Sequence, residues 1–106
     1  MKYIYSQKID DSFQAKLELI DISNEMMEII VLSVPELYRG KGIGDKLLKE
    51  VCKDADRSKI TLRLFVKSFG KLNQKQLESW YTKNGFNKIG NKYMIRFPFG
   101  KTKFFL

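Results

Sequence analysis

The residues best placed to do chemistry form a glycine-rich segment that joins an apolar run to an amphipathic stretch. From Val34 to Gly44 it reads Val-Pro-Glu-Leu-Tyr-Arg-Gly-Lys-Gly-Ile-Gly. Glycines let an anion come close to the main chain, and a helix that begins here directs its backbone N–H groups and the positive end of its dipole at that anion. The segment therefore predicts a phosphate-binding loop.

The glycine spacing does not fit the two common nucleotide motifs. A Walker loop needs four residues between its first glycine and a Gly-Lys-Ser/Thr triplet, and this segment has no such triplet. A Rossmann fingerprint needs G-x-G-x-x-G, whereas Gly40, Gly42 and Gly44 give G-x-G-x-G. Neither nucleotide motif therefore fits this segment.

Missing residue types narrow the chemistry further. The 106 residues include no histidine and one cysteine, Cys52. Histidine bases, histidine metal sites, internal disulfides and multi-cysteine metal sites are therefore excluded. Proton transfer must use Asp, Glu, Lys, Tyr or water. Cys52 falls on the apolar face of a predicted helix, which indicates a core residue rather than a nucleophile.

Composition indicates one globular domain over residues 1–106, with 43% apolar residues and a net charge of +8. Residues 79–106 hold six Lys or Arg and no Asp or Glu. This excess predicts an anionic ligand or partner, or merely a lysine-rich solubilising surface. The chain has no long hydrophobic stretch, so we expect a soluble cytoplasmic protein with no membrane partner.

The elements that must position the loop follow from hydrophobic spacing. Alternating or β-branched apolar residues predict strands at 2–9, 13–22, 25–34, 60–67, 86–89 and 92–97. Helical spacing predicts helices over 42–57 and 74–84, and Gly85 suits a left-handed cap after the second. The order β-β-β-α-β-α-β-β predicts an α+β fold. Two main helices pack on a mixed, mostly antiparallel sheet, and the first helix is a right-handed crossover.

The loop and the second predicted helix together resemble the GNAT superfamily of acetyl-CoA-dependent N-acetyltransferases. Its pyrophosphate motif, Q/R-x-x-G-x-G/A, is matched by Arg39, Gly42 and Gly44. Downstream, Leu77-x-x-Trp80-Tyr81-x-x-x-Gly85-Phe86 is similar to the family's A-x-x-L-Y-x-x-x-G-F. The resemblance covers residues 25–97. It implies a GNAT-like fold, acetyl-CoA as cosubstrate, no metal, and direct acetyl transfer to an amine.

The resemblance also implies which residues hold the cofactor. Leu32, Ser33 and Val34 would line its pantetheine arm. The pyrophosphate would be held by the loop residues Arg39, Gly40, Lys41, Gly42, Ile43 and Gly44. Family members often have an asparagine seven residues before the tyrosine. That position is Gln74 here, with Asn73 one residue earlier, so both are candidates for cofactor contact.

Tyr81 matches the family's tyrosine that protonates the departing thiolate, although packing beside Trp80 would also explain it. A backbone N–H near Val34 is the expected oxyanion donor.

Glu28 is a candidate base, because some protein-acetylating relatives place a glutamate on this strand that acts through water. Strict alternation with Ile30 and Leu32 would turn it inward and raise its pKa. A solvated strand-edge glutamate, Glu36 as a substitute, and a water chain without a dedicated base are the alternatives.

The acceptor side is predicted to be minimal. GNAT proteins usually carry two helices between their first two strands, and here only residues 10–12 separate those strands. An open acceptor side suits a macromolecular amine, such as a protein lysine or N-terminus, better than an enclosed metabolite. We expect a monomer or a homodimer.

Two other functions stay open. One is a catalytically idle acetyl-CoA-binding or interaction module. The other, which ranks last, is a small basic nucleic-acid-binding domain with interleaved aromatic and basic residues. Those residues are Phe65, Phe69, Phe97, Phe99 and Phe104 with Lys67, Lys71, Arg96, Lys101 and Lys103.

Overall fold

The computed structural model describes residues 1–10, 12–35, 40–67 and 72–99. In this part the elements are β1 (Lys2–Lys8), β2 (Gln14–Ser23), β3 (Met26–Ser33), α1 (Ile43–Ser58), β4 (Thr61–Phe65), α2 (Gln74–Lys83), β5 (Asn87–Ile89) and β6 (Tyr93–Arg96). The predicted α+β class and element order are confirmed, and each boundary lies within two residues of its predicted position.

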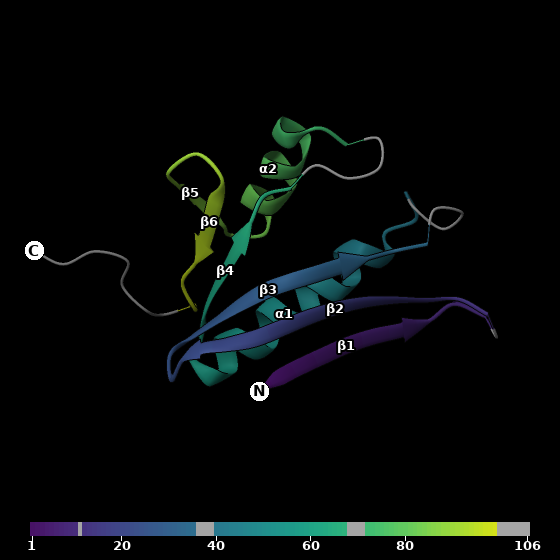
Figure 1. Cartoon of the computed structure of the whole chain (residues 1–106), viewed down its shortest axis with the longest axis horizontal. Helices are drawn as coiled ribbons and strands as arrows, with labels where there is room; N and C mark the ends of the chain where they lie inside the picture. Colours follow the sequence, from purple (N-terminus) through teal and green to yellow (C-terminus); the bar gives the residue numbers. More distant parts are fainter. Residues whose placement is uncertain (11, 36–39, 68–71, 100–106) are drawn as a thin grey trace, which may run out of the picture.

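The strands form one sheet in the order β1-β2-β3-β4-β6-β5 (Figure 1). Only β3 and β4 are parallel, and α1 is the crossover that connects them. All other neighbours are antiparallel. The predicted mixed, mostly antiparallel sheet is therefore confirmed.

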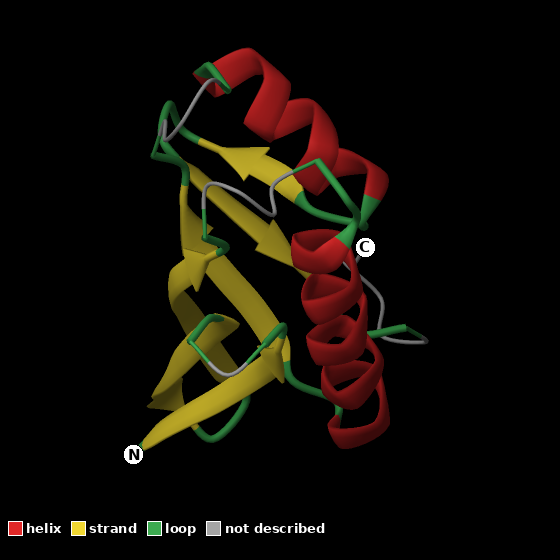
Figure 2. Cartoon of the chain, turned by 90° about the vertical axis from the view of Figure 1, so that its right-hand side faces the viewer, coloured by secondary structure: helices red, strands yellow, loops and turns green. Residues whose placement is uncertain are grey.

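Both helices cover the same face of the sheet (Figure 2). Leu19, Ile29, Leu64 and Met94 form one row of paired residues across four strands and are buried beneath the helices. The buried face of α1 has the predicted helical spacing. Its residues are Leu47, Leu48, Val51, Cys52 and Ala55. The hydrophobic core therefore lies between this face of the sheet and the helices.

The opposite face of the sheet, called the open face below, carries no helix in the described part of the chain. Its residues alternate with those of the core. One row of paired positions runs through Ile20, Glu28, Arg63 and Ile95. Polar and apolar side chains are mixed there, as expected for a sheet face that meets solvent.

The two ends of α1 are both flanked by left-handed backbone. Gly42 precedes the helix with φ of 81°, and Lys59 follows it with φ of 59°. At the C-terminal end the helix carbonyls are closed by backbone N–H groups: Lys59 donates to Asp56 at 3.3 Å and Ile60 donates to Ala55 at 2.8 Å.

A charged contact ties the C-terminal half of α1 to β6. Arg96 donates through Nη1 and Nη2 to the two carboxylate oxygens of Asp56 at 2.8 and 3.0 Å, and Phe99 N–H donates to the same carboxylate at 2.7 Å. These bonds hold the pKa of Asp56 below its usual value, with Arg96 as the main cause.

Neither helix described here has the length and apolar character needed to span a bilayer.

Candidate active site

The parallel strands β3 and β4 part after a short pairing. They pair only from Met26 with Thr61 to Ile29 with Leu64. Beyond that point β3 continues against β2, while β4 turns away with β6 (Figure 1). In the described residues, the edge of β3 that faces β4 therefore has no strand partner after Ile29.

A β-bulge lies at the point where the strands part. Glu18 of β2 pairs with Val31, and the next residue, Leu19, pairs with Ile29, so Ile30 is an extra residue in β3. A bulge increases the local twist and ends regular pairing. The opening between β3 and β4 is therefore built into the register of the sheet.

The N-terminus of α1 has the features of an anion site. Gly40 and Gly42 have φ of 79° and 81°, and apart from their chain neighbours no described residue has an atom within 4 Å of the place where a Cβ would stand on either. Gly42 has no side chain to cap the helix. Among the described residues, the N–H groups of Ile43, Gly44 and Asp45 have no hydrogen-bond acceptor. Within the described residues, these three N–H groups at the positive end of the helix form the kind of group that binds an anion.

Gly44 brings three elements together. A Cβ on this residue would lie 3.5 Å from Val34 Cγ2 and 3.8 Å from Trp80 Cη2. The end of β3, the first turn of α1 and the middle of α2 therefore meet at one point. The predicted pantetheine residues Leu32 and Ser33 lie at the end of β3, just before Val34.

Asp45, in the first turn of α1, does not cap its own helix. Its carboxylate accepts hydrogen bonds from Lys49 Nζ at 2.7 Å and from Trp80 Nε1 at 2.8 Å. These two bonds, Lys49 first, lower the pKa of Asp45. The side chain is thus turned along α1 and toward α2, and it does not accept from the N–H groups of the first helical turn.

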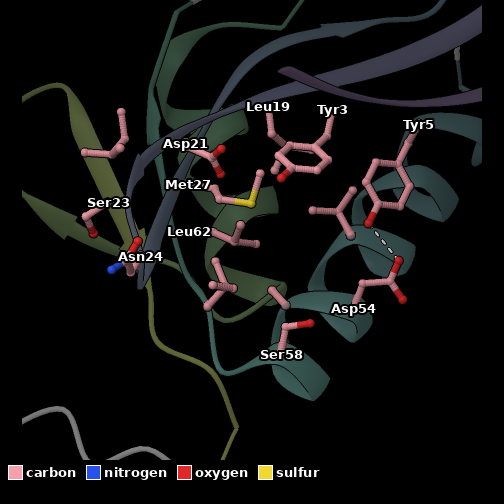
Figure 3. Close-up of a pocket in the computed structure, with 14 residues that line it drawn as sticks. Tyr3, Tyr5, Leu19, Asp21, Ser23, Asn24, Met27, Asp54, Ser58 and Leu62 are labelled. Carbon is pink, nitrogen blue, oxygen red and sulfur yellow. Dashed lines mark hydrogen bonds between the residues drawn. The ribbon is translucent and has the colours of Figure 1, made fainter. Parts of the chain in front are cut away.

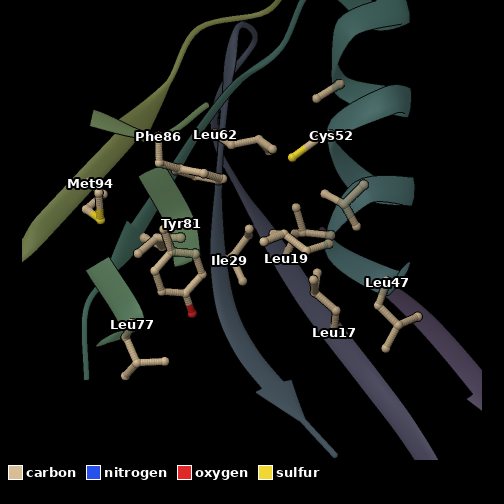
Figure 4. Close-up of a cluster of buried hydrophobic side chains, with 14 of the residues drawn as sticks. Leu17, Leu19, Ile29, Leu47, Cys52, Leu62, Leu77, Tyr81, Phe86 and Met94 are labelled. Carbon is tan, nitrogen blue, oxygen red and sulfur yellow. The ribbon is translucent and has the colours of Figure 1, made fainter. Parts of the chain in front are cut away.

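Tyr81 is buried on α2, with 7% of its surface exposed. Its ring centroid lies 5.0 Å from that of Trp80 and 5.7 Å from that of Phe86. Its hydroxyl makes no hydrogen bond to the described residues, and it points in the direction in which β3 runs (Figure 4). Burial raises the pKa of Tyr81 to about 12, so the group is protonated near neutral pH, as an acid must be.

Glu28 lies on the open face, so the prediction that it faces inward with Ile30 and Leu32 is wrong. The bulge at Ile30 breaks the alternation: Leu32 pairs with Leu17 on the helix side, whereas Glu28 pairs with Ile20 and Arg63 on the open face. Glu28 Oε1 accepts a hydrogen bond from Arg63 Nε at 2.6 Å.

Arg63 in turn lies over the Tyr93 ring, with Cζ 5.6 Å from the ring centroid. Arg63 was missed from the sequence, because only the β3–β4 register places it opposite Glu28.

Asn73 and Gln74 hold α2 in place. The Asn73 side chain accepts from Gln76 N–H at 2.9 Å and completes a capping box with the Gln76 side chain. Gln74 donates to Glu78 at 2.8 Å and to the Asn91 carbonyl at 3.1 Å. Their contact with a cofactor stays a prediction.

Several other residues singled out from the sequence lie outside the described part of the chain. Arg39 and Glu36 lie outside the described residues, as do Phe69, Lys71, Lys101, Lys103 and Phe104. Cys52 is buried against the core, and burial raises its pKa to about 11. That environment agrees with a core residue rather than a nucleophile. Within the described ranges no three Cys, Asp or Glu residues gather as metal ligands would.

A separate hollow of about 630 Å³ lies between β1, β2 and the C-terminal half of α1 (Figure 3). Its two carboxylates already have partners. Tyr5 donates to Asp54 at 2.7 Å, and Asp21 pairs with the N-terminal ammonium at 3.5 Å. This hollow is at the opposite end of α1 from the glycine loop, and we do not assign it to the site.

Comparison with known proteins points to one family. The sequence profile of the acetyltransferase (GNAT) domain matches residues 9–88. A search of curated proteins found no match.

The similar solved structures include three that bear on the site. The PaiA N-acetyltransferase of Thermoplasma acidophilum, in complex with coenzyme A, is 29% identical with a TM-score of 0.64, over 84% of this chain and 57% of its own. An aminoglycoside 6'-N-acetyltransferase complexed with coenzyme A is 13% identical with a TM-score of 0.75, and the match covers 96% of this chain and 76% of that protein. The anti-CRISPR protein AcrVA5 is 21% identical with a TM-score of 0.64, and the match covers 85% of this chain and 96% of that protein. The chain thus spans little more than half of the Thermoplasma acidophilum protein.

Proposed function

Because this chain belongs to the GNAT superfamily of acetyltransferases, we propose that it moves an acetyl group from acetyl-CoA directly to an amine. The family and fold expected from Arg39, Gly42, Gly44 and the downstream block are those found. The observation that carries the proposal is the parting of β3 and β4 beside the uncapped N-terminus of α1. Two of the similar structures hold coenzyme A, which supports the same ligand here.

The two halves of the site fit the two polar parts of coenzyme A. The N–H groups at the start of α1, which have no acceptor among the described residues, and the positions at Gly40 and Gly42 suit its pyrophosphate. In the described part of the chain, the edge of β3 after Ile29 pairs with no strand, and it suits the amide groups of the pantetheine arm, which can bond to it as a strand would. We assign these contacts to residues 32–34 and 39–44.

Direct transfer makes three demands on the chain. When the amine nitrogen bonds to the carbonyl carbon, the nitrogen becomes positively charged and must lose a proton. The oxyanion that forms on the carbonyl must be stabilised. When the carbon–sulfur bond breaks, the departing thiolate must gain a proton. Tyr81, kept protonated by burial, supplies the proton to sulfur and recovers it from water. Glu28 receives the amine proton through water, and a backbone N–H near Val34 stabilises the oxyanion.

We assign the acceptor to the open face, because the helices and the core fill the other face. The part of the open face beside the Glu28–Arg63 pair exposes apolar side chains: Ile30 is 42% exposed, Phe65 47% and Tyr93 40%. Exposed apolar surface of this kind suits contact with another macromolecule. We therefore propose that the acceptor is a polypeptide amine, a lysine or an N-terminus.

The test uses labelled acetyl-CoA with three acceptors: a peptide whose lysine lies between phenylalanines, the same peptide with serines, and spermidine. Mass spectrometry follows the label, and release of free thiol gives the rate. We expect the phenylalanine peptide to react fastest. A faster reaction of spermidine would overturn the polypeptide acceptor. Heat of binding with coenzyme A but no label on any acceptor would favour the idle binding module. No heat and no label would overturn the proposed function.

A matched pair of variants tests the acceptor surface. Phe65→Ser removes an exposed ring near the opening, and Ile4→Ser removes an exposed side chain on β1 at the far edge of the same face. We expect Phe65→Ser to raise KM for the phenylalanine peptide roughly 5- to 10-fold, while Ile4→Ser leaves it unchanged. Neither variant should alter the affinity for coenzyme A. Equal effects of the two variants would move the acceptor site away from Phe65.

A further inference from the structure

A small polar network joins the first turn of α1 to the end of α2. The Asp45 carboxylate accepts from Trp80 Nε1 at 2.8 Å and from Asn84 Nδ2 at 3.4 Å, and Lys49 pairs with its other oxygen at 2.7 Å. Asn84 also donates to the Trp80 carbonyl at 3.0 Å and accepts from Lys49 at 3.1 Å. Every member of the network therefore contacts at least two others.

The network affects anion binding because Asp45 lies in the first turn of α1, next to the N–H groups assigned to the anion. An acidic residue in the first turn of a helix ordinarily turns toward the free N–H groups, where its charge is most stabilised. Here both carboxylate oxygens are held elsewhere, by Lys49 and by Trp80. Without Trp80 Nε1, the carboxylate loses its shortest bond to α2. It can then compete with a phosphate for the N–H groups at residues 43–45.

The network also affects the proposed general acid, Tyr81, because Trp80 is its neighbour in the sequence. Trp80 and Tyr81 are consecutive on α2, about 100° apart around the helix axis, so a bond that fixes one side chain also fixes the direction of the other. The Trp80 ring also packs beside Gly44. Rotation of α2 by even 10–20° takes a catalytic group out of productive geometry.

We propose that the Asp45–Trp80 hydrogen bond is a positioning contact between the two halves of the site. It holds the Asp45 carboxylate off the anion-binding N–H groups, and it fixes the rotation of α2, which carries Tyr81. This inference rests on the proposed acetyltransferase function. It assigns positioning roles to Asp45 and Trp80, neither of which touches the reacting atoms.

The test is a double-mutant cycle with a matched control. Trp80→Phe keeps a ring but removes the N–H donor, and Asp45→Asn keeps an oxygen acceptor but removes the charge. Tyr5→Phe is the control, because it removes an aromatic donor to Asp54, an aspartate near the other end of α1. For each protein the Kd for coenzyme A is measured by calorimetry, kcat by thiol release and folding by thermal unfolding.

We expect Trp80→Phe to weaken coenzyme A binding about 5-fold, because the freed carboxylate competes for the N–H groups. It should also lower kcat roughly 10-fold, because Tyr81 is displaced. Adding Asp45→Asn should restore the affinity, since the competing charge is gone, but not kcat. Asp45→Asn alone should keep kcat within about 3-fold of the wild type, because the asparagine oxygen still accepts from Trp80.

A purely structural contact would lower the melting temperature without this separation of Kd from kcat. If the wild type is active and Trp80→Phe matches Tyr5→Phe in both Kd and kcat, the inference is wrong while the proposed function stands. The inference is also wrong if the double variant fails to restore affinity. A wild type that neither binds coenzyme A nor transfers acetyl overturns the proposed function itself, and the inference with it.

Discussion

Near its N-terminal end, α1 holds an aspartate that accepts a bond from an aromatic side chain of another element and pairs with a cation one turn later. Asp45 has Trp80 of α2 and Lys49 as these partners. Toward its C-terminal end the same pattern returns: Asp54 accepts from Tyr5 of β1 and pairs with Arg57. Side-chain chemistry alone therefore does not distinguish the two ends.

The main chain does distinguish them. At the C-terminal end, the backbone N–H groups of Lys59 and Ile60 close the last carbonyls of the helix. At the N-terminal end, the first N–H groups have no acceptor among the described residues, and the glycines before them leave the approach open. The comparison teaches that a functional site can be located by the backbone groups that the fold leaves unsatisfied.

The largest expected effect is at Gly42. If it were absent, the conclusion that the two ends of α1 differ in function would be wrong. Gly42→Val places a branched side chain over the free N–H groups, so we expect coenzyme A affinity to fall more than ~10³-fold, measured by calorimetry. The control is Gly90→Val, because Gly90 has φ of 70° and equally open surroundings in the β5–β6 turn. Both variants should lose about 1–2 kcal/mol of stability from left-handed strain. Only the first should lose binding; equal affinities would remove the N-terminal end from the site.

The second effect contrasts two tyrosines. Tyr81→Phe should lower kcat roughly 10²-fold, the usual contribution of a general acid, with little change in melting temperature because the hydroxyl makes no hydrogen bond to the described residues. Tyr5→Phe should do the reverse: it loses the bond to Asp54 and about 1 kcal/mol of stability, and it keeps kcat. Steady-state kinetics and thermal unfolding of both variants decide the matter. An unchanged kcat in Tyr81→Phe would assign this tyrosine to packing.

The third effect concerns pH at the structural end of α1. Because the pKa of Asp56 is lowered in the folded state, its contribution to stability is present above the unfolded value of about 3.9 and is lost as pH falls through the folded value. Asp56→Asn should therefore cost about 1–2 kcal/mol at neutral pH. The difference from the wild type should shrink as the pH is lowered toward about 2. Melting curves across this range test the sign, and a difference that grows in acid would contradict it.

The smallest effect is a gain in stability. Lys59 is a non-glycine residue in left-handed backbone, so Lys59→Gly should stabilise the fold by about 0.5–1 kcal/mol. Coenzyme A binding should stay the same, because this end of α1 has no part in the site. Chemical denaturation measures the gain. A loss of stability would show that the bond from Lys59 Nζ to the Phe99 carbonyl outweighs the backbone strain.

The regular elements were predictable because their signals are local. The spacing of Leu47, Leu48 and Val51 indicates the buried face of α1, and Gly85, with φ of 93°, follows α2 as predicted. The capping box of Asn73 and Gln76 was not predicted, although its N-x-x-Q spacing is also a local signal.

The details of the site were less predictable, because they depend on contacts between distant residues. A period-two pattern assumes a regular strand, and the extra residue at Ile30 moved Glu28 to the other face from Leu32. The Asp45–Trp80 bond joins residues 35 positions apart on two helices, and no local spacing encodes it.

The edge of β3 to which we assign the pantetheine arm has no strand partner among the described residues, so it can also pair with other polypeptides. Unpaired strand edges are the usual starting point for intermolecular β-pairing, and natural sheets protect them with bulges, charges or covering segments. Here the bulge at Ile30 lies at the start of the exposed edge. A bound pantetheine arm would cover the rest, so the cofactor would also protect the protein from aggregation.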